Sequence, residues 1–307
     1  MELHTCLWND VDAFSFREND LHPLTKHYPT LQIRIHQNVN SFLAVAEQAD
    51  FVLTWDFKKS WYAACPKLKA IFTPAAGNDW VQGDPLKKVK LVYGRFHGRL
   101  LAESLLGALL LMNHRMPEVM HNHHHRDWDR NRLTTTRLLG NQTVLIIGFG
   151  TIGQCCARLI QQTGANVIGV RRYPDQADKN GQEIHSLSAL PLLLGQADHV
   201  VLLLPGISSS DRFMNPDRLA MMKQGSYIYN FGRGNSLLSN DLLEALPRLA
   251  GAFLDVTEEE PLPPDSPLWD RSKVVITPHS SCIYSEYKPL FVDEVTGHLK
   301  TYLKPVT

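Results

Sequence analysis

The sequence predicts an α/β protein with a doubly wound parallel sheet and a second, smaller α/β unit. A short apolar run at 143–147 leads directly into Gly-x-Gly-x-x-Gly at 148–153, the pattern of strand, tight turn and helix. Short apolar runs alternate with helix-like segments along most of the chain, as in parallel sheets with helical crossovers. A length of 307 residues allows two such units.

The composition is typical of a globular protein and excludes several function classes. Apolar residues make up 44% and charged residues 20% of the chain. Lys+Arg and Asp+Glu number 31 each, so bulk charge predicts no binding to nucleic acid or anionic membranes. No apolar run approaches the ~18–20 residues of a membrane span, and the residues after Met1 do not resemble a signal peptide. Five cysteines without a Cys-x-x-Cys pair indicate reduced thiols and a cytoplasmic protein.

Residues 1–94 are predicted to form the smaller unit. Its apolar runs predict a helix over 42–49 and strands at 5–8, 31–35, 51–55, 68–73 and 89–93. The fourth of these strands leads into the loop 74–77. Backbone N–H groups of Ala76 and Gly77 could bind an anion there, although an ordinary turn is an equal alternative.

A long apolar helix is expected at 99–116, after a crossing point between the domains at 94–98. It is apolar on most faces, which predicts burial all round and a share in a homodimer interface. Pro117 is expected to end or kink it. His121 and His125 have i, i+4 spacing, which suits a metal, but no cysteine or acidic cluster nearby completes a ligand set. We therefore favour an exposed helix end without a metal.

The glycine motif after the strand 143–147 predicts dinucleotide binding. Gly148 would make the turn, Gly150 would let a pyrophosphate approach the backbone, and Gly153 would let the helix pack closely. The first N–H groups of the helix, at Thr151 and Ile152, would hold the pyrophosphate.

The end of the next strand, at 166–170, indicates which dinucleotide is bound. An acidic residue there would accept hydrogen bonds from the ribose of NAD. Arg171 and Arg172 stand there instead, and two guanidinium groups suit the 2′-phosphate of NADP. NADP is therefore preferred and NAD stays an alternative, since both arginines could be ordinary surface residues.

Further polar residues follow the remaining strands of the larger unit. These strands are predicted at 199–204, 226–230, 252–255 and 274–277, with a final helix at 290–303 that returns to the first unit. Ligands of open parallel sheets bind beyond the carboxyl ends of the strands. The residues expected at this edge are Pro205, Arg233, Asp255, Glu258 to Glu260 and His279.

This set suits hydride transfer to a keto acid. Arg233 could bind a carboxylate and polarise a ketone, His279 could supply a proton, and a glutamate could orient the imidazolium. Each residue also has a structural alternative, because single histidines are often structural and acidic runs are often solvated. The prediction depends on their convergence at one edge.

The chain resembles the D-isomer-specific 2-hydroxyacid dehydrogenases over nearly its whole length. The motifs that carry the resemblance are Gly148–Gly153, Asn230–Gly234, Leu254-Asp255-Val256, Glu260-Pro261-Leu262 and Thr277-Pro278-His279. The resemblance implies a Rossmann-type cofactor domain and a flavodoxin-like substrate domain. It also implies that Arg233 binds the substrate, that Glu260 and His279 are the catalytic pair, that Asp255 holds the nicotinamide carboxamide, and that the Ala76–Gly77 backbone binds the substrate carboxylate.

Within this family the arginine pair and the run 262–269 are similar to the glyoxylate/hydroxypyruvate reductases. Three stretches depart from the family pattern. They are Ser280-Ser281-Cys282 after His279, 94–97 at the hinge, and 245–251, which is about two residues short and contracts the spacing from Arg233 to Glu260. The resemblance implies a substrate domain at 1–94 completed by 283–307, and a cofactor domain at 95–282. The expected reaction is NADPH-dependent reduction of a small 2-keto acid to the D-2-hydroxy acid. The alternatives are an NAD-dependent dehydrogenase of other substrate range and a non-catalytic NAD(P)-sensing interaction protein.

Overall fold

The computed structural model describes residues 1–77, 80–134, 136–173 and 182–304. The chain forms two compact units, one of Met1–His97 with Ile283–Thr307 and one of Gly98–Cys282. The break between the units lies at His97 and Gly98, whereas the sequence suggested residues 94 and 95. Among the described residues, no helix combines the length and the apolar character needed to cross a membrane.

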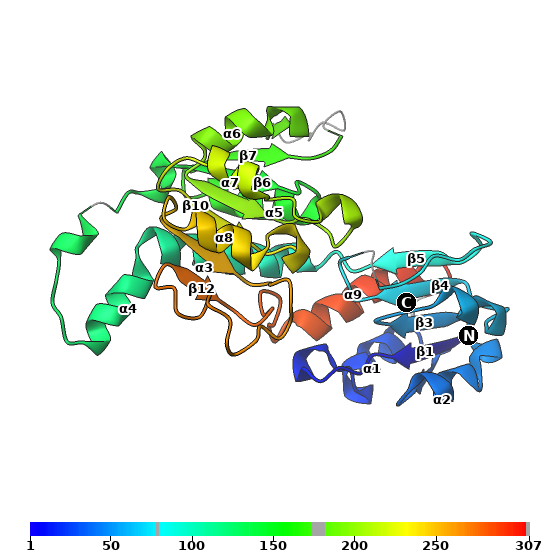
Figure 1. Cartoon of the computed structure of the whole chain (residues 1–307). Helices are drawn as coiled ribbons and strands as arrows, with labels where there is room; N and C mark the ends of the chain where they lie inside the picture. Colours follow the sequence, from blue (N-terminus) through cyan, green and yellow to red (C-terminus); the bar gives the residue numbers. More distant parts are fainter. Residues whose placement is uncertain (78–79, 135, 174–181, 305–307) are drawn as a thin grey trace. The chain divides into compact units, whose positions relative to one another are not determined.

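The first unit is a parallel sheet with helices (Figure 1). The strand order is β2-β1-β3-β4-β5. Its elements are β1 (Glu2–Cys6), α1 (Glu18–His27), β2 (Gln32–Ile35), α2 (Val39–Leu43), β3 (Phe51–Thr54), β4 (Ala70–Thr73), β5 (Lys90–Tyr93) and α9 (Tyr287–Leu299). All residues of β3 and β4 are buried, because both faces of the central strands are covered.

The second unit is a doubly wound parallel sheet (Figure 1), which confirms the predicted fold class. Its strand order is β12-β11-β10-β9-β6-β7-β8. The strands are β6 (Thr143–Ile147), β7 (Asn166–Val170), β8 (Glu183–His185), β9 (His199–Leu202), β10 (Tyr227–Asn230), β11 (Gly251–Leu254) and β12 (Val274–Ile276). The helices are α3 (His97–Asn113), α4 (Met116–His124), α5 (Thr151–Gln161), α6 (Leu190–Gln196), α7 (Pro216–Met221) and α8 (Ser239–Ala245).

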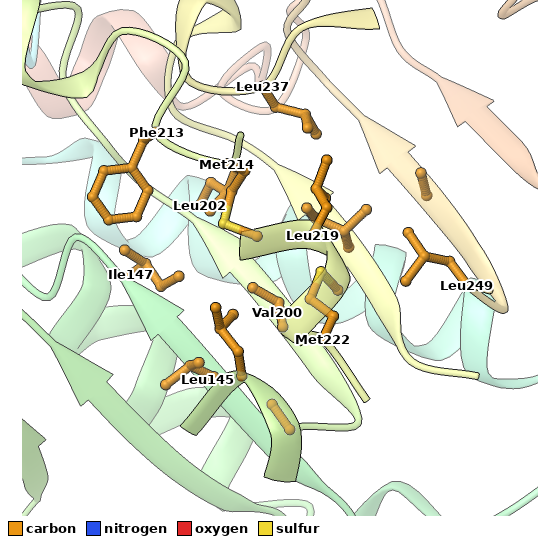
Figure 2. Packing of buried hydrophobic residues seen from close by; sticks show 14 of the residues in the cluster. Leu145, Ile147, Val200, Leu202, Phe213, Met214, Leu219, Met222, Leu237 and Leu249 are labelled. Carbon is orange, nitrogen blue, oxygen red and sulfur yellow. The ribbon is translucent and has the colours of Figure 1, made fainter. Parts of the chain in front are cut away.

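Alternation along the central strands divides the core of this unit into two layers. Leu145 and Ile147 of β6 contribute to one apolar cluster, with Val200 and residues of α6 to α8. Figure 2 shows Leu145, Ile147 and Val200 in this cluster together with Leu219 and Met222. Val144 and Ile146 point to the opposite face, where α3 and α5 cover the sheet. The strand order reverses between β6 and β9, which is the position where such sheets bind ligands.

The helical region after residue 97 differs from the prediction. A single helix over 99–116 was expected, but α3 ends at Asn113 and α4 begins at Met116. Arg115 has a φ of 54° between them. Pro117 lies in the first turn of α4, where its missing N–H costs no intrahelical bond, so it helps to start a helix rather than end one.

One stripe of α3 is exposed, so the helix is not buried all round within the chain. The stripe contains Arg99, Glu103, Gly107 and Leu110, which are spaced by one helical turn. The opposite side, with Leu105 and Ala108 among others, packs against the sheet. Because the rest of α3 packs within the chain, only the exposed stripe of this helix could take part in the expected subunit interface.

Candidate active site

The loop between β6 and α5 has the shape that a pyrophosphate site requires. Gly148 has a φ of +101°, and a Cβ there would collide with the carbonyl of Leu203 after β9. The N–H groups of Gly148 and Phe149 bond to the carbonyl of Val170 at 3.0 and 3.1 Å, which fixes the turn against β7. A Cβ on Gly150 would meet nothing within 4 Å, so the backbone there is open to a ligand.

This loop leads straight into α5, whose N-cap is Gly150. The first N–H groups of any helix lack partners within the helix, so those near Thr151 and Ile152 are suited to a phosphate. Gly153 is buried, and a Cβ there would lie 2.8 Å from the carbonyl of Gly148. The residues present therefore fit the predicted dinucleotide.

Arg171 and Arg172 follow β7 directly, at the carboxyl edge of the sheet. The Arg171 backbone N–H bonds to the carbonyl of His185 in β8 at 3.1 Å. The Arg172 guanidinium donates to the hydroxyl of Ser209 at 2.6 Å. Ser209 lies beyond β9, after Pro205, and no sequence pattern had pointed to it. The adjoining stretch 174–181 lies outside the described residues.

A tightly packed loop after β10 carries Arg233. The Asn230 side chain shapes this loop: its carbonyl accepts from the Gly232 N–H and its amide donates to the carbonyl of Arg233, both at 3.2 Å. Gly234 is pressed against the backbone of Thr257, and a Cβ there would overlap the Thr257 carbonyl. The Arg233 loop is thereby held against the loop that follows β11.

The buried carboxylate of Asp255, at the end of β11, holds the loop that carries His279. Its Oδ1 accepts from the Thr277 hydroxyl at 2.7 Å and from the Ser280 N–H at 2.8 Å. Its Oδ2 accepts from the Ser281 N–H at 3.2 Å, and its backbone carbonyl accepts from the His279 N–H at 2.8 Å. Asp255 is therefore a positioning residue for His279 in addition to the cofactor contact predicted for it.

Glu260 and His279 form the predicted pair. The Nδ1 of His279 lies 2.9 Å from Oε2 of Glu260, and the other carboxylate oxygen accepts from the Thr257 N–H at 3.2 Å. Burial acts to raise the pKa of Glu260, but the hydrogen bond and charge of His279, the Thr257 N–H and the charge of Arg233 outweigh it. The pKa of Glu260 is therefore lowered, and the carboxylate stays ionised at neutral pH.

The rest of the acidic run has a structural use. The Glu258 carboxylate accepts from the N–H of Ser239 at 3.0 Å and from its hydroxyl at 2.7 Å. Ser239 is the first residue of α8, so Glu258 caps that helix. The structure thus separates a capping glutamate from the one that contacts the histidine.

The loop 74–77 belongs to the first unit and follows β4 at the carboxyl edge of its sheet. The Ala75 N–H bonds to the Thr73 hydroxyl at 3.2 Å, and the Pro74 carbonyl accepts from the Tyr287 hydroxyl at 3.3 Å. These contacts fix the start of the loop and leave Ala76 exposed at its tip.

The histidines of α4 lie in its last turn. The His121 and His125 rings are 4.1 Å apart, and Nδ1 of His125 lies 2.8 Å from the carbonyl of His121. Among the residues that the structure describes, no group of three or more His, Cys, Asp or Glu is gathered as a metal site.

Comparison with known proteins identifies the family. The family model "D-isomer specific 2-hydroxyacid dehydrogenase, NAD binding domain" matches residues 106–281. The chain is 33% identical to a hydroxypyruvate reductase of Blautia hydrogenotrophica over 168 residues, which are 54% of this chain and 52% of that enzyme. The chain therefore spans about half the length of this relative.

Two further similarities cover more of the chain. A D-lactate dehydrogenase of Treponema pallidum is 30% identical over 242 residues, 76% of this chain and 72% of that protein. A solved structure of the NADPH-dependent glyoxylate/hydroxypyruvate reductase of Sinorhizobium meliloti, in complex with NADP and sulfate, is 26% identical with a TM-score of 0.80. The structural match covers 99% of this chain and 96% of the Sinorhizobium enzyme. The chain therefore belongs to the D-isomer-specific 2-hydroxyacid dehydrogenase family of NAD(P)-dependent oxidoreductases, as its motifs predicted.

Proposed function

We propose that this protein is a 2-keto acid reductase that uses NADPH and releases the D-2-hydroxy acid. The observation that carries the proposal is the Glu260–His279 pair, held in loops at the same sheet edge as Arg233 and the glycine turn. The unit Gly98–Cys282 is the cofactor domain, and the unit Met1–His97 with Ile283–Thr307 is the substrate domain. Glyoxylate and hydroxypyruvate are the first substrates to test, because the similar proteins include a hydroxypyruvate reductase and a glyoxylate/hydroxypyruvate reductase.

In this mechanism the Arg233 guanidinium binds the substrate carboxylate and polarises the ketone oxygen as negative charge develops on it. The hydride comes from the reduced nicotinamide when NADPH is bound. His279 then protonates the developing alkoxide. Since its Nδ1 faces the Glu260 carboxylate, Nε2 is the nitrogen that delivers the proton.

Glu260 stabilises the charged imidazolium that must exist before the proton moves. Its lowered pKa keeps the negative charge in place at neutral pH. The side chains of His279 and Glu260 are 48% and 39% exposed, so a substrate and solvent protons can both reach the pair. The Ala76–Gly77 backbone is assigned to the substrate carboxylate, and Asp255 to the nicotinamide carboxamide.

NADP is proposed over NAD because Arg171 and Arg172 stand where an NAD-specific site has an acidic residue. The bond between Arg172 and Ser209 supports this, since the two groups form one donor cluster at the carboxyl edge. Gly148, Gly150, Gly153 and Pro205 complete the proposed cofactor contacts.

The test is a reduction assay that follows NADPH and NADH oxidation with glyoxylate, hydroxypyruvate, pyruvate and phenylpyruvate. The His279→Ala variant should lower kcat by about 10²–10⁴ and leave NADPH affinity nearly unchanged, because only the proton donor is lost. Binding of both cofactors without turnover of any 2-keto acid would favour the non-catalytic alternative. Normal turnover by His279→Ala would remove this residue from the mechanism.

A further inference from the structure

A row of aromatic rings lies in the first unit, and the proposed reaction does not use it. Phe14 is 4.7 Å from Tyr287 and 5.9 Å from Trp55, both in edge-on geometry, and Trp55 is 6.2 Å from Trp80. The indole N–H of Trp55 also bonds to the Phe14 carbonyl at 3.3 Å, which holds the middle of the row. We call these four residues the aromatic row.

The aromatic row adjoins the loop assigned to the substrate carboxylate. One end is Tyr287, whose hydroxyl donates to the carbonyl of Pro74 at the start of that loop. Trp55 directly follows β3, which pairs with β4 through Leu53 and Phe72, so both strands end at the same edge. Trp80 follows Gly77 closely in the chain and completes the row.

The far end of the row is exposed, although the rings behind it are covered. Trp80 is 46% exposed, and Trp8, which follows β1 at the same edge, is 40% exposed. Phe14 and Trp55 are half-buried, and Tyr287 is buried. Exposure alone does not distinguish these indoles, since Trp128 and Trp269 are more exposed, but their position beside the loop 74–77 places large apolar rings where an apolar group of a ligand could cover them.

The chemistry of the candidate substrates decides what this surface would contact. The carbonyl carbon of glyoxylate carries only a hydrogen atom as its side group. In hydroxypyruvate the same carbon carries a small, polar hydroxymethyl group. Neither offers apolar area to a tryptophan. A ring on the third carbon of a 2-keto acid would project from the same carboxylate anchor and could stack on Trp55 and Trp80.

We propose that the site selects 2-keto acids with an aromatic side chain, such as phenylpyruvate, over glyoxylate and hydroxypyruvate. This inference rests on the proposed function, because it assumes that the substrate carboxylate is bound at Ala76–Gly77. The aromatic row of the first unit then determines specificity for the side chain of the 2-keto acid.

The experiment compares kcat/KM for phenylpyruvate, pyruvate and glyoxylate in wild type and three variants. Trp80→Ala removes an open ring, Trp80→Phe retains a ring, and Leu86→Ala removes an exposed apolar side chain of the same unit, which is 72% exposed. Calorimetry of phenyllactate binding to the NADP complex gives a second readout that is independent of turnover. Thermal melting of each variant shows that it is folded.

The expected result is a wild-type preference for phenylpyruvate over glyoxylate of about tenfold or more, from the buried and stacked ring. Trp80→Ala should lose about tenfold for phenylpyruvate, mainly in KM, and change little for glyoxylate. Trp80→Phe should keep most of the preference, and Leu86→Ala all of it. Weaker phenyllactate binding should accompany the loss in Trp80→Ala.

Two results overturn the inference and are distinguishable. If glyoxylate or hydroxypyruvate is the better substrate and Trp80→Ala affects all substrates equally, the aromatic row is not a specificity surface, while the proposed function stands. If no 2-keto acid is reduced with either cofactor, the proposed function fails and the inference fails with it.

Discussion

The structure gives Asp255 two separable roles, which the substitution Asp255→Asn can distinguish. Its carboxylate accepts hydrogen bonds from Thr277, Ser280 and Ser281, and these bonds position His279. It is also assigned to the nicotinamide carboxamide. Asparagine has nearly the same shape but replaces one acceptor oxygen by a donor NH₂ group.

The size of the effect follows from the hydrogen bonds. If the amide oxygen takes the place of Oδ1, the NH₂ group faces the Ser281 N–H across 3.2 Å, so two donors oppose each other. If the amide is flipped, the NH₂ group opposes the Ser280 N–H instead, while the Thr277 hydroxyl can turn and accept from it. A hydrogen bond to a charged group contributes about 1.5–3 kcal/mol, so we expect a loss of about 2–3 kcal/mol in the free energy of unfolding. For a unit of this size this corresponds to a Tm lower by about 4–10 °C.

Turnover should fall as well, because the loop that carries His279 loses part of its anchor. Displacement of a catalytic group by about 1 Å costs up to about 10²-fold, so we expect kcat to fall by about 10- to 100-fold. The assay measures Tm without cofactor, NADPH affinity by fluorescence, and kcat with the best 2-keto acid. Thr277→Val removes one bond to the same carboxylate and should cost about 1.5–3 kcal/mol, the range for a hydrogen bond to a charged group. Ser280→Ala keeps its backbone N–H and should behave like wild type.

The outcome separates the two roles. A residue that only binds the carboxamide would leave the Tm of the cofactor-free protein unchanged on substitution and raise the NADPH dissociation constant. Substitution of a positioning residue lowers the Tm of the cofactor-free protein and also lowers kcat. Wild-type Tm and kcat in Asp255→Asn would refute the proposed anchoring of the His279 loop.

Three further predictions concern the cofactor, the assembly and the response to pH. Replacing Arg171 and Arg172 by alanine should lower kcat/KM for NADPH about ten- to a hundredfold and kcat/KM for NADH much less. Equal losses for the two cofactors would contradict a 2′-phosphate site. The wild-type protein should sediment as a dimer at micromolar concentration. The Leu110→Glu variant should sediment as a monomer, because a charge on the exposed stripe of α3 opposes burial of that stripe in an interface. A monomeric wild type would exclude this interface. Burial lowers the pKa of His199 to about 4, so the unfolded state binds more protons below about pH 6.5. The free energy of unfolding in urea should therefore include a part of about 2 kcal/mol that is lost between pH 7 and pH 5. His199→Gln should lack this part, and an equal pH dependence in both proteins would be contrary evidence.

The sequence predicted most of the larger sheet, because its central strands are buried on both faces and appear as continuous apolar runs. β6, β9, β10 and β11 were all expected within these runs. The short edge strand β8 was not predicted, since half-exposed Glu183–His185 has no apolar pattern. Propensity also missed α1, which contains Pro23 and is held by burial of Leu21 and Leu24.

Sheet topology predicts which candidate residues come together, but not every contact that they make. Residues at the carboxyl ends of parallel strands must meet at one edge, so the approach of Glu260 to His279 follows from topology. The use of Glu258 as a helix cap could not be predicted, because its partner Ser239 is remote in the chain. Asp255 was assigned only to the cofactor for the same reason: its bonds to Thr277 and beyond are tertiary contacts that leave no local pattern.

The departure from the family pattern after His279 has a structural explanation. Ser280 and Ser281 bond to Asp255 through their backbone N–H groups, so the identity of their side chains is not what anchors the loop. The same holds on the other side of the site, where the Thr257 N–H bonds to Glu260 and the Thr257 carbonyl packs on Gly234. Backbone groups of neighbouring loops thus position much of the reactive set. Anchoring through backbone groups tolerates new side chains but not a displaced main chain. A Cβ at Gly234 or loss of the carboxylate at Asp255 should therefore disturb the site more than side-chain changes at residues that contribute only backbone groups.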